Sequence, residues 1–282
     1  MNESLFSPKY QHRGNMSQKY KFIKEYLVQF LKEETFKTGL NGGVLVLDAT
    51  VESFVVAMLA KEAFGNRLLT LLGENTLRTD ETVSEKVKNF CLEKDIRFQS
   101  LQSSTVAKAY TKFSIQDDKR REAFLSRVTM VEVYDIAAGE RALVLGSRNK
   151  SELLLGEGVL HGDLACAINP LGDLYATEVE EFAFYLGLSG FVEVFRPRAT
   201  LREASAETAR FSQDALDSAL KGFTEERLSR EELIEKGYDS EMVEMIIRRI
   251  YQNQYKHRPP VIAKLTSRTI GHDLQYPRDI KL

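Results

Sequence analysis

Apolar strands alternate with helices between residues 43 and 147, and this alternation constrains the fold more than any other feature of the sequence. The expected strands lie at residues 43–49, 67–72, 96–101 and 142–146. The helices expected between them are 53–64, 81–94 and 119–138. The first strand, GVLVLDA, shows no alternation of apolar and polar residues, which is typical of a strand buried on both faces. The pattern predicts an α/β fold with a doubly wound parallel sheet.

The chain on either side of this alternation divides into a polar beginning and a helical end. Residues 1–16 are polar, and we expect them to form a flexible N-terminal segment. Ser17 is expected to cap a long helix in which apolar residues recur every three or four positions. From Thr177 onward the sequence is mostly helical, and SREELIEKG predicts a helix capped by Ser229. Residues 17–282 are therefore expected to form a single α/β domain with a helical C-terminal part.

The composition is that of a globular protein with nearly balanced charge. Apolar residues make up 43% of the 282 residues, and the net charge is −2. Neither a nucleic acid nor a membrane is therefore expected as the main partner. Two cysteines are too few for a disulfide scaffold, and the longest apolar run, residues 54–60, is too short to span a membrane. These features predict a cytoplasmic protein.

Two turns are the first places to look for a site, because ligands of open parallel sheets lie beyond the carboxyl ends of the strands. The turn after the first strand, LDATVES at residues 47–53, has no glycine and begins with an acid, unlike a phosphate-binding loop. The turn after the fourth strand begins a long stretch with many polar residues and glycines. A connection this long is either functional or a solvated connection that ends at a cap on Thr177. The sequence leaves both interpretations open.

Histidine and cysteine patterns favour no metal or nucleophile site. The four histidines lie far apart in the sequence and have no cysteine partners at zinc-site spacing. Cys91 is expected in the core, and Cys166 lies in a loop without an evident activating base. The basic run KHRPPVIAK, at residues 256–264, is either a phosphate clamp or a solvated face.

Two blocks of the sequence are similar to the family of ammonia-dependent NAD synthetases. The first is GSRNKSELLLGEGVLHGDLACAINPLGDLYATEV, and the second is LIEKGYDSEMVEMIIRRIYQNQYKHRPPVIAKLTSRTIGHDL. The resemblance covers residues 20–273 and implies a Rossmann-like sheet of the adenine-nucleotide alpha-hydrolase type, assembled as a homodimer. It also implies a reaction in which ATP and Mg²⁺ activate the nicotinate carboxylate of deamido-NAD and ammonia displaces AMP. The chain has no room for a glutaminase domain, so it resembles the ammonia-using members.

The resemblance assigns ATP binding to a set of positions that depart from the family's pattern. The family's S-G-G-x-D-S loop aligns with residues 48–53, and its phosphate-contacting lysine in G-D-L-Y-K-T-E becomes an alanine. Of the paired arginines in A-R-x-R-M, the second becomes Thr129. The implied ATP-binding residues are Asp48, Ala49, Thr50, Ser53, Arg127, Ser147 and Ala176.

The metal and acceptor positions are better preserved. Glu52 takes the place of the family's metal-binding aspartate and is one methylene longer, and Glu152 matches the second metal carboxylate. The resemblance assigns substrate binding to Asp163, Lys256 and Lys264. The acidic acceptor-side run of the family is replaced by REASAETAR, which loses most of its acids.

The departures among the implied ATP-binding residues affect the binding of phosphate. The family's glycines let backbone N–H groups approach pyrophosphate closely, and Ala49 and Thr50 place Cβ atoms there. A carboxylate at Asp48 about 4 Å from a phosphate charge would cost about 4 kcal/mol at an effective dielectric near 20. Ala176 removes a cation from a reaction that depends on charge stabilisation.

Three functions remain open. In the first, the synthetase activity is lost or strongly weakened, so no residue is assigned a catalytic role, and whether the chain is an enzyme is uncertain. In the second, the chain is an active AMP-forming amide ligase that uses ATP and Mg²⁺ with altered phosphate recognition or another acceptor. In the third, it is a non-catalytic ligand-binding or scaffolding dimer whose pocket binds a small nucleotide, a different small molecule or a partner chain, and a basic segment favours an anionic ligand. The basic residues of that segment are Arg196, Arg198, Arg202 and Arg210.

Overall fold

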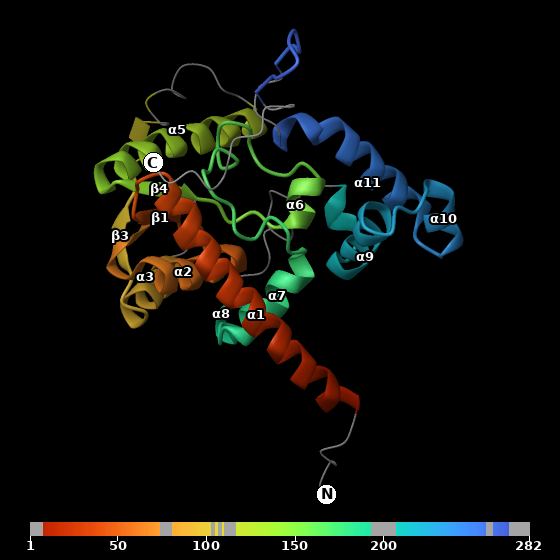
Figure 1. The fold of residues 1–282 in the computed structure, drawn as a ribbon, viewed down its shortest axis with the longest axis horizontal. Helices are drawn as coiled ribbons and strands as arrows, with labels where there is room; N and C mark the ends of the chain where they lie inside the picture. Colours follow the sequence, from red (N-terminus) through yellow and green to blue (C-terminus); the bar gives the residue numbers. More distant parts are fainter. Residues whose placement is uncertain are drawn as a thin grey trace, which may run out of the picture.

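A four-stranded parallel sheet forms the centre of the molecule (Figure 1). The computed structural model describes residues 8–73, 81–102, 105–106, 109, 117–192, 207–257 and 262–270. The strands are β1 (Gly42–Val46), β2 (Leu68–Leu72), β3 (Arg97–Ser100) and β4 (Ala142–Leu145). Their order is β3-β2-β1-β4, and every neighbouring pair is parallel. The predicted α/β fold with a doubly wound parallel sheet is confirmed.

Helices cover both faces of the sheet. Figure 1 shows α5 on one face and α1, α2 and α3 on the other. Their bounds are α1 (Pro8–Lys37), α2 (Val51–Phe64), α3 (Glu81–Glu93) and α5 (Asp118–Glu140), and a short 3-10 helix, η1 (Gly65–Arg67), follows α2. Leu45 packs in the core on the side of α2, whereas its neighbour Val44 packs in the core on the side of α5. Both faces are therefore apolar, as the sequence of the first strand indicates.

The C-terminal part is helical and lies beside the β4 end of the sheet (Figure 1). Two helices, α6 (Lys150–Leu154) and α7 (Ala176–Tyr185), connect it to the sheet, followed by α8 (Ser189–Val192). The remaining helices are η3 (Thr208–Arg210), α9 (Gln213–Thr224), α10 (Arg230–Glu235), α11 (Ser240–Asn253) and η4 (Gln254–His257). A separate apolar cluster joins α6, α9 and α11. Within the residues that the structure describes, no helix is long and apolar enough to cross a membrane.

Three helix boundaries test the capping arguments. Ser229 caps α10 in a capping box with Glu232, as predicted. The prediction that Ser17 caps the first helix is wrong, because α1 already begins at Pro8. Thr177 likewise lies within the first turn of α7, whose N-cap is Tyr175.

The long connection after β4 contains a helix that the sequence interpretation missed. The short helix α6 begins with a capping box in which Asn149 and Glu152 bond each other's backbone amides. The signal was present in the sequence as Asn-Lys-Ser-Glu, which has the spacing of a capping box.

Candidate functional site

The candidate site lies where the turns after β1 and β4 meet. These strands are neighbours in the sheet, and the chain crosses from one side of β1 to the other between β3 and β4. Ligands of such sheets bind at this switch point, beyond the carboxyl ends of the strands. The two turns are in direct contact, because Asn149 Nδ2 donates to Glu52 Oε1 at 3.0 Å. The structure therefore brings together both turns that the sequence marked.

The turn after β1 is closed by its own side chains. Thr50 is the N-cap of α2 and forms a capping box with Ser53. Its Oγ1 accepts from the Ser53 amide at 3.3 Å and donates to Asp48 Oδ1 at 2.6 Å. Ala49 has a φ of 60°, the left-handed region that favours glycine, and its side chain is buried. The backbone of the turn thus bends as a glycine would allow, but the Ala49 side chain fills the space that a glycine would leave open.

This arrangement places two carboxylates at the N-terminus of a long apolar helix. Asp48 precedes α2, and Glu52 lies in its first turn and is buried. A helix N-terminus stabilises negative charge, and here side chains of the protein supply that charge. A phosphate group brought to this turn would therefore meet like charges, and each unit pair at 4 Å costs about 4 kcal/mol at an effective dielectric near 20.

The turn after β4 is organised by a buried arginine that the sequence interpretation did not single out. The guanidinium of Arg148 donates through Nη1 to Glu152 Oε1 at 2.7 Å and through Nε to Asp163 Oδ2 at 2.7 Å. Nη2 also contacts Asp163 Oδ2. Arg148 is 4% exposed and Glu152 is 3% exposed, so the pair lies in the protein interior. Nothing near Arg148 in the sequence indicates its burial, because its second acid lies 15 residues later.

The carboxylates assigned to magnesium by resemblance are already engaged by protein donors. Glu152 Oε1 accepts from the Arg148 guanidinium, and Oε2 accepts from the Asn149 backbone amide at 2.9 Å. Glu52 Oε1 takes the Asn149 side chain. Among the residues that the structure describes, no three His, Cys, Asp or Glu side chains are grouped to hold a metal ion. In this arrangement the residues present do not fit a divalent cation, and a metal role for Glu52 and Glu152 stays a prediction.

Ala176, which the resemblance assigns to ATP binding, is buried at the start of α7. Its amide donates to Ser151 Oγ at 3.0 Å, and Ser151 Oγ donates to Asp217 Oδ1 at 2.6 Å. The other oxygen of Asp217 accepts from the Thr177 amide at 2.8 Å. A buried carboxylate from α9 therefore caps the N-terminus of α7, and this end of the helix is closed within the protein.

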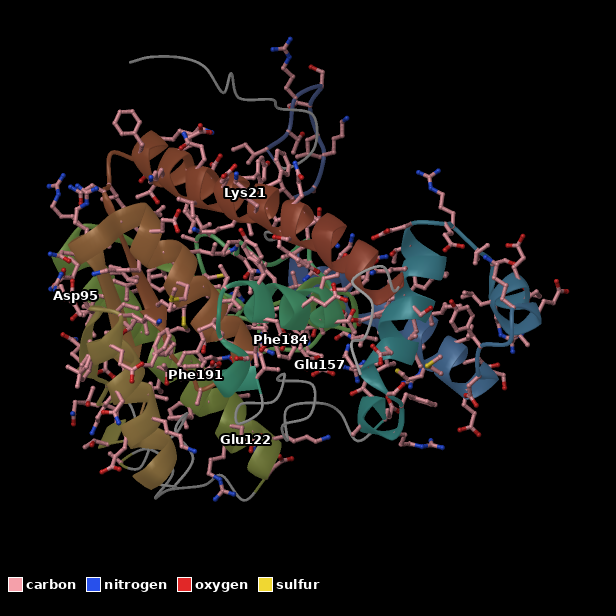
Figure 2. All side chains as sticks on the ribbon, turned by 90° about the horizontal axis from the view of Figure 1, so that it is seen from below. Lys21, Asp95, Glu122, Glu157, Phe184 and Phe191 are labelled. Carbon is pink, nitrogen blue, oxygen red and sulfur yellow. The ribbon has the colours of Figure 1, made fainter. Side chains whose placement is uncertain are left out.

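The loop at residues 156–158 is held by the C-terminal helices. Figure 2 places Glu157 between the sheet and those helices, where Arg249 Nη2 donates to its Oε1 at 3.3 Å. Lys256 Nζ donates to the carbonyl oxygens of Gly156 at 2.5 Å and Gly158 at 3.4 Å. Burial lowers the pKa of Lys256 below its usual value. In this structure, Lys256 contributes to the position of the loop.

Other predicted residues lie at the edge of the site or away from it. Arg127 is exposed, and its Nε donates to the Leu160 carbonyl at 3.2 Å. Asp163 accepts from Ser126 Oγ at 3.2 Å, Ser147 is buried, and Lys264 is exposed. Burial raises the pKa of Cys166 to about 11, so its thiol stays protonated at neutral pH. Arg196, Arg198 and Arg202 lie outside the described residues.

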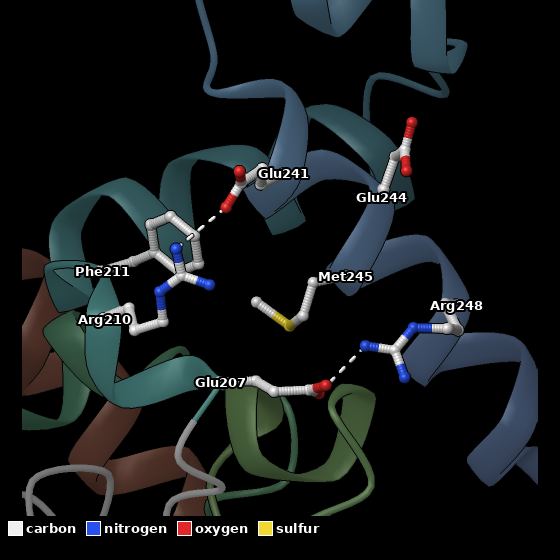
Figure 3. Close-up of a pocket in the computed structure, with 7 residues that line it drawn as sticks. All are labelled: Glu207, Arg210, Phe211, Glu241, Glu244, Met245 and Arg248. Atoms are coloured by element: carbon white, nitrogen blue, oxygen red, sulfur yellow. Dashed lines mark hydrogen bonds and ion pairs between the residues drawn. The ribbon is translucent and has the colours of Figure 1, made fainter.

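A pocket of about 220 Å³ lies away from these turns, between η3 and α11 (Figure 3). Its rim carries ion pairs between Arg210 and Glu241, and between Arg248 and Glu207, both at 2.9 Å. Phe211 supplies apolar lining. The sequence predicts Arg210 in a basic segment over an anionic ligand, and in this structure an acid on α11 is its partner.

Comparison with known proteins identifies the family. The model of a family described as NAD synthase matches residues 23–260. The NH₃-dependent NAD⁺ synthetase of Chlorobium phaeobacteroides is 36% identical over 92% of this chain and 95% of the relative. That of Chlorobaculum tepidum is 34% identical over 94% of this chain and 97% of the relative. The structure of the NH₃-dependent NAD synthetase from Campylobacter jejuni, in complex with nitrate, matches with a TM-score of 0.74 and 28% identity, covering 87% of this chain and 99% of that one. The predicted resemblance is confirmed, and the chain belongs to the NAD synthase family.

Proposed function

We propose that this chain is a cytoplasmic NAD synthase-family protein whose ammonia-dependent synthetase reaction is lost or strongly weakened at the ATP site. The observation that carries the proposal is the Asp48 carboxylate, which occupies the turn after β1 and accepts from Thr50 Oγ1 at 2.6 Å. The resemblance implies that this turn holds the phosphates of ATP, and an anion fixed there opposes the binding of ATP.

Two further features support this proposal. Ala176 is buried, with its amide bonded to Ser151 Oγ, so this position supplies no cation to a phosphate. The guanidinium of Arg148 is 2.7 Å from Glu152 Oε1, so one of the two carboxylates assigned to magnesium is neutralised by the protein itself. Phosphoryl and adenylyl transfer depend on cations at the phosphates, and the two features leave Ala176 without a cation and Glu152 already paired with one.

An active ligase with altered phosphate recognition is the second candidate, and the backbone at Ala49 favours it. With a φ of 60°, the turn after β1 keeps the bend that a glycine-containing loop would use. On this alternative, ATP-dependent release of pyrophosphate occurs with some carboxylate acceptor. Failure of calorimetry to detect ATP binding at millimolar concentration, with magnesium present, would count heavily against it.

A coupled assay with ATP, magnesium, deamido-NAD and ammonia tests the main proposal. The full chain is expected to turn over far below the rates of ordinary enzymes, and a kcat of about 1 s⁻¹ or more contradicts the proposal. The inorganic pyrophosphate released is measured in the same reaction. Pyrophosphate without NAD identifies the second candidate instead.

A loop variant tests whether the turn after β1 is the cause. The variant combines Asp48→Ser, Ala49→Gly and Thr50→Gly, and we expect ATP binding to increase by about a hundredfold or more, because one like-charge contact of about 4 kcal/mol is removed. The control is Asp135→Ser, which removes an exposed acid from α5. Equal affinity of the loop variant and the control contradicts the argument. Ala176→Lys is measured as a separate variant, because a lysine at this buried position also perturbs packing.

We further propose that the chain forms a homodimer, and that a retained dimer without turnover would bind a small nucleotide. Mass measurement after size-exclusion chromatography is expected to give twice the 32.1 kDa of one chain. A monomer contradicts the dimer. Mass spectrometry of compounds that co-purify with the protein identifies a bound nucleotide, and a different ligand class supports a changed binding role.

A further inference from the structure

A buried cation lies between two acids at the centre of the turn after β4. The guanidinium of Arg148 is 4% exposed. It lies 2.7 Å from Glu152 Oε1 and, through Nε, 2.7 Å from Asp163 Oδ2. Glu152 belongs to α6, and Asp163 lies 11 residues further along the connection to α7. The Arg148 side chain therefore joins α6 to the part of the connection around Asp163.

The two acids require a cation because of where they lie. Glu152 is 3% exposed, and the side chain of Asp163 is 28% exposed. A carboxylate withdrawn from water is strongly unfavourable unless a positive charge and hydrogen bonds compensate for the lost solvation. Arg148 supplies both, because its planar guanidinium carries a permanent charge and presents several N–H donors at fixed angles.

The same geometry disfavours a second cation. Asn149 links the two turns by donating its amide to Glu152 Oε2 at 2.9 Å and its side chain to Glu52 Oε1 at 3.0 Å. Both oxygens of Glu152 and Oε1 of Glu52 thus face N–H donors, and a guanidinium lies 2.7 Å from Glu152 Oε1. A divalent ion at Glu152 would have to displace this guanidinium or bear its repulsion.

We propose that Arg148, which bridges Glu152 and Asp163, is the resident cation of this site and occupies Glu152 in place of a divalent metal ion. The turn after β4 is then held in shape without magnesium, and the protein has no metal site of its own at Glu52 and Glu152. The inference deepens the proposed function and rests on the same site, but it concerns the cation and is measured without nucleotide.

The test uses Mn²⁺ alone as the probe and the full-length protein. Free Mn²⁺ is followed by electron paramagnetic resonance during a titration. Wild type is expected to show no binding below millimolar Mn²⁺. Arg148→Ser removes the guanidinium but leaves the acids, and its affinity for Mn²⁺ is expected to increase at least tenfold. The double variant Arg148→Ser with Glu152→Gln removes one of the acids and is expected to lose that gain.

Thermal unfolding provides a second readout. Arg148→Ser is expected to unfold at a lower temperature than wild type and to recover part of the difference with Mn²⁺, whereas wild type does not respond. The matched control is Arg127→Ser, which removes an exposed arginine whose Nε contacts the Leu160 carbonyl. Arg148→Lys keeps a cation and is expected to behave like wild type toward Mn²⁺.

Two results overturn the inference. One is sub-millimolar Mn²⁺ binding by wild type, and the other is an Arg148→Ser variant that is as stable as Arg127→Ser and gains no affinity for Mn²⁺. If Arg148→Ser does not fold, the wild-type titration and Arg148→Lys decide the question. Synthetase turnover by wild type contradicts the proposed loss of activity but not this inference, whereas Mn²⁺ binding without nucleotide contradicts only the inference.

Discussion

The turns after β1 and β4 meet at one site but are held together in different ways. The turn after β1 is stabilised locally, because Asp48, Thr50 and Ser53 bond one another within six residues. The turn after β4 depends on distant parts of the chain, since Ser151 bonds to Asp217 and Glu157 to Arg249. The first turn is therefore governed by its own sequence, whereas the shape of the second is a property of the whole fold. Substitutions that separate local from distant support test this comparison.

The largest effect is expected where α11 packs against the long turn. Gly156 has a φ of 70°, and a Cβ placed there would lie 2.1 Å from the side chain of Asn253. Gly156→Ala is expected to reduce the free energy of unfolding by about 2–4 kcal/mol, because backbone strain adds to overpacking. Urea unfolding measures the difference.

Gly39→Ala is the matched control for this prediction. Gly39 has a φ of 74°, but a Cβ at this position would have no atom within 4 Å. Only the strain of a left-handed alanine remains, and we expect a loss of about 1 kcal/mol. Equal losses for the two variants would mean that α11 does not support the turn.

The second effect is expected at the buried carboxylate that joins α9 to α7. Asp217 is 2% exposed and accepts from Ser151 Oγ, the Thr177 amide and Gln213 Nε2. Asp217→Asn replaces an acceptor oxygen with a donor facing other donors, so we expect a loss of about 2–3 kcal/mol in urea unfolding. The control is Asp214→Asn, an exposed acid on the same helix. A loss no larger than that of the control would show that distant support is unimportant here.

A smaller effect is expected in the local turn. Thr50→Ala removes the N-cap of α2 and the hydroxyl that bonds Asp48, so the free energy of unfolding is expected to fall by about 1 kcal/mol. Thr50→Ser keeps the hydroxyl and is expected to lose much less. If Thr50→Ser is as unstable as Thr50→Ala, the methyl group and not the cap stabilises this turn.

The smallest effect is a pH dependence at Glu178, which links α7 to α1. Burial alone would raise the pKa of this carboxyl, but hydrogen bonds from Lys19 and the Tyr175 amide, with the charge of Lys221, lower it below its ordinary value. Because the folded protein holds the charged form, this stabilisation is present above the unfolded pKa, near 4.5, and is lost as pH falls through the folded pKa.

The expected contribution is at most about 1 kcal/mol, since the partner Lys19 is half exposed. Unfolding measured from pH 6 to pH 3 is expected to lose less stability in Glu178→Gln than in wild type. An identical decline in the two proteins would mean that the ionised Glu178 carboxylate does not stabilise the end of the long turn.

The sheet could be predicted from the sequence because β1, β2 and β4 are short apolar runs that need no knowledge of the rest of the chain. β2 is buried at every residue, in agreement with its run of leucines. β3 is more exposed, in agreement with its polar residues Arg97, Gln99 and Ser100. Its edge position is shared with β4, which is mostly buried, and which strand lies at an edge is set by the topology of the whole chain.

The location of the candidate site could be predicted, but the contacts between its residues could not. Both turns could be located because ligands of parallel sheets lie beyond the carboxyl ends of the strands, and Asp48 in the first turn is evident from the sequence. The roles of Arg148 and Asp217 could not be inferred, because an arginine or an aspartate in a polar stretch looks like a surface residue until the partners are known. Glu152 has a local role, in a capping box with Asn149, that its assignment to a metal site did not consider.

The backbone at Ala49 has a consequence for stability. Its φ of 60° lies in a region that is costly for alanine and free for glycine, so this turn carries strain that a glycine would not. Ala49→Gly would relieve about 1–2 kcal/mol of strain against an entropic cost of about 0.5–1 kcal/mol, so it would meet no stability barrier. The strain of this turn is thus confined to one residue, whereas the buried charges around Arg148 depend on three side chains at once.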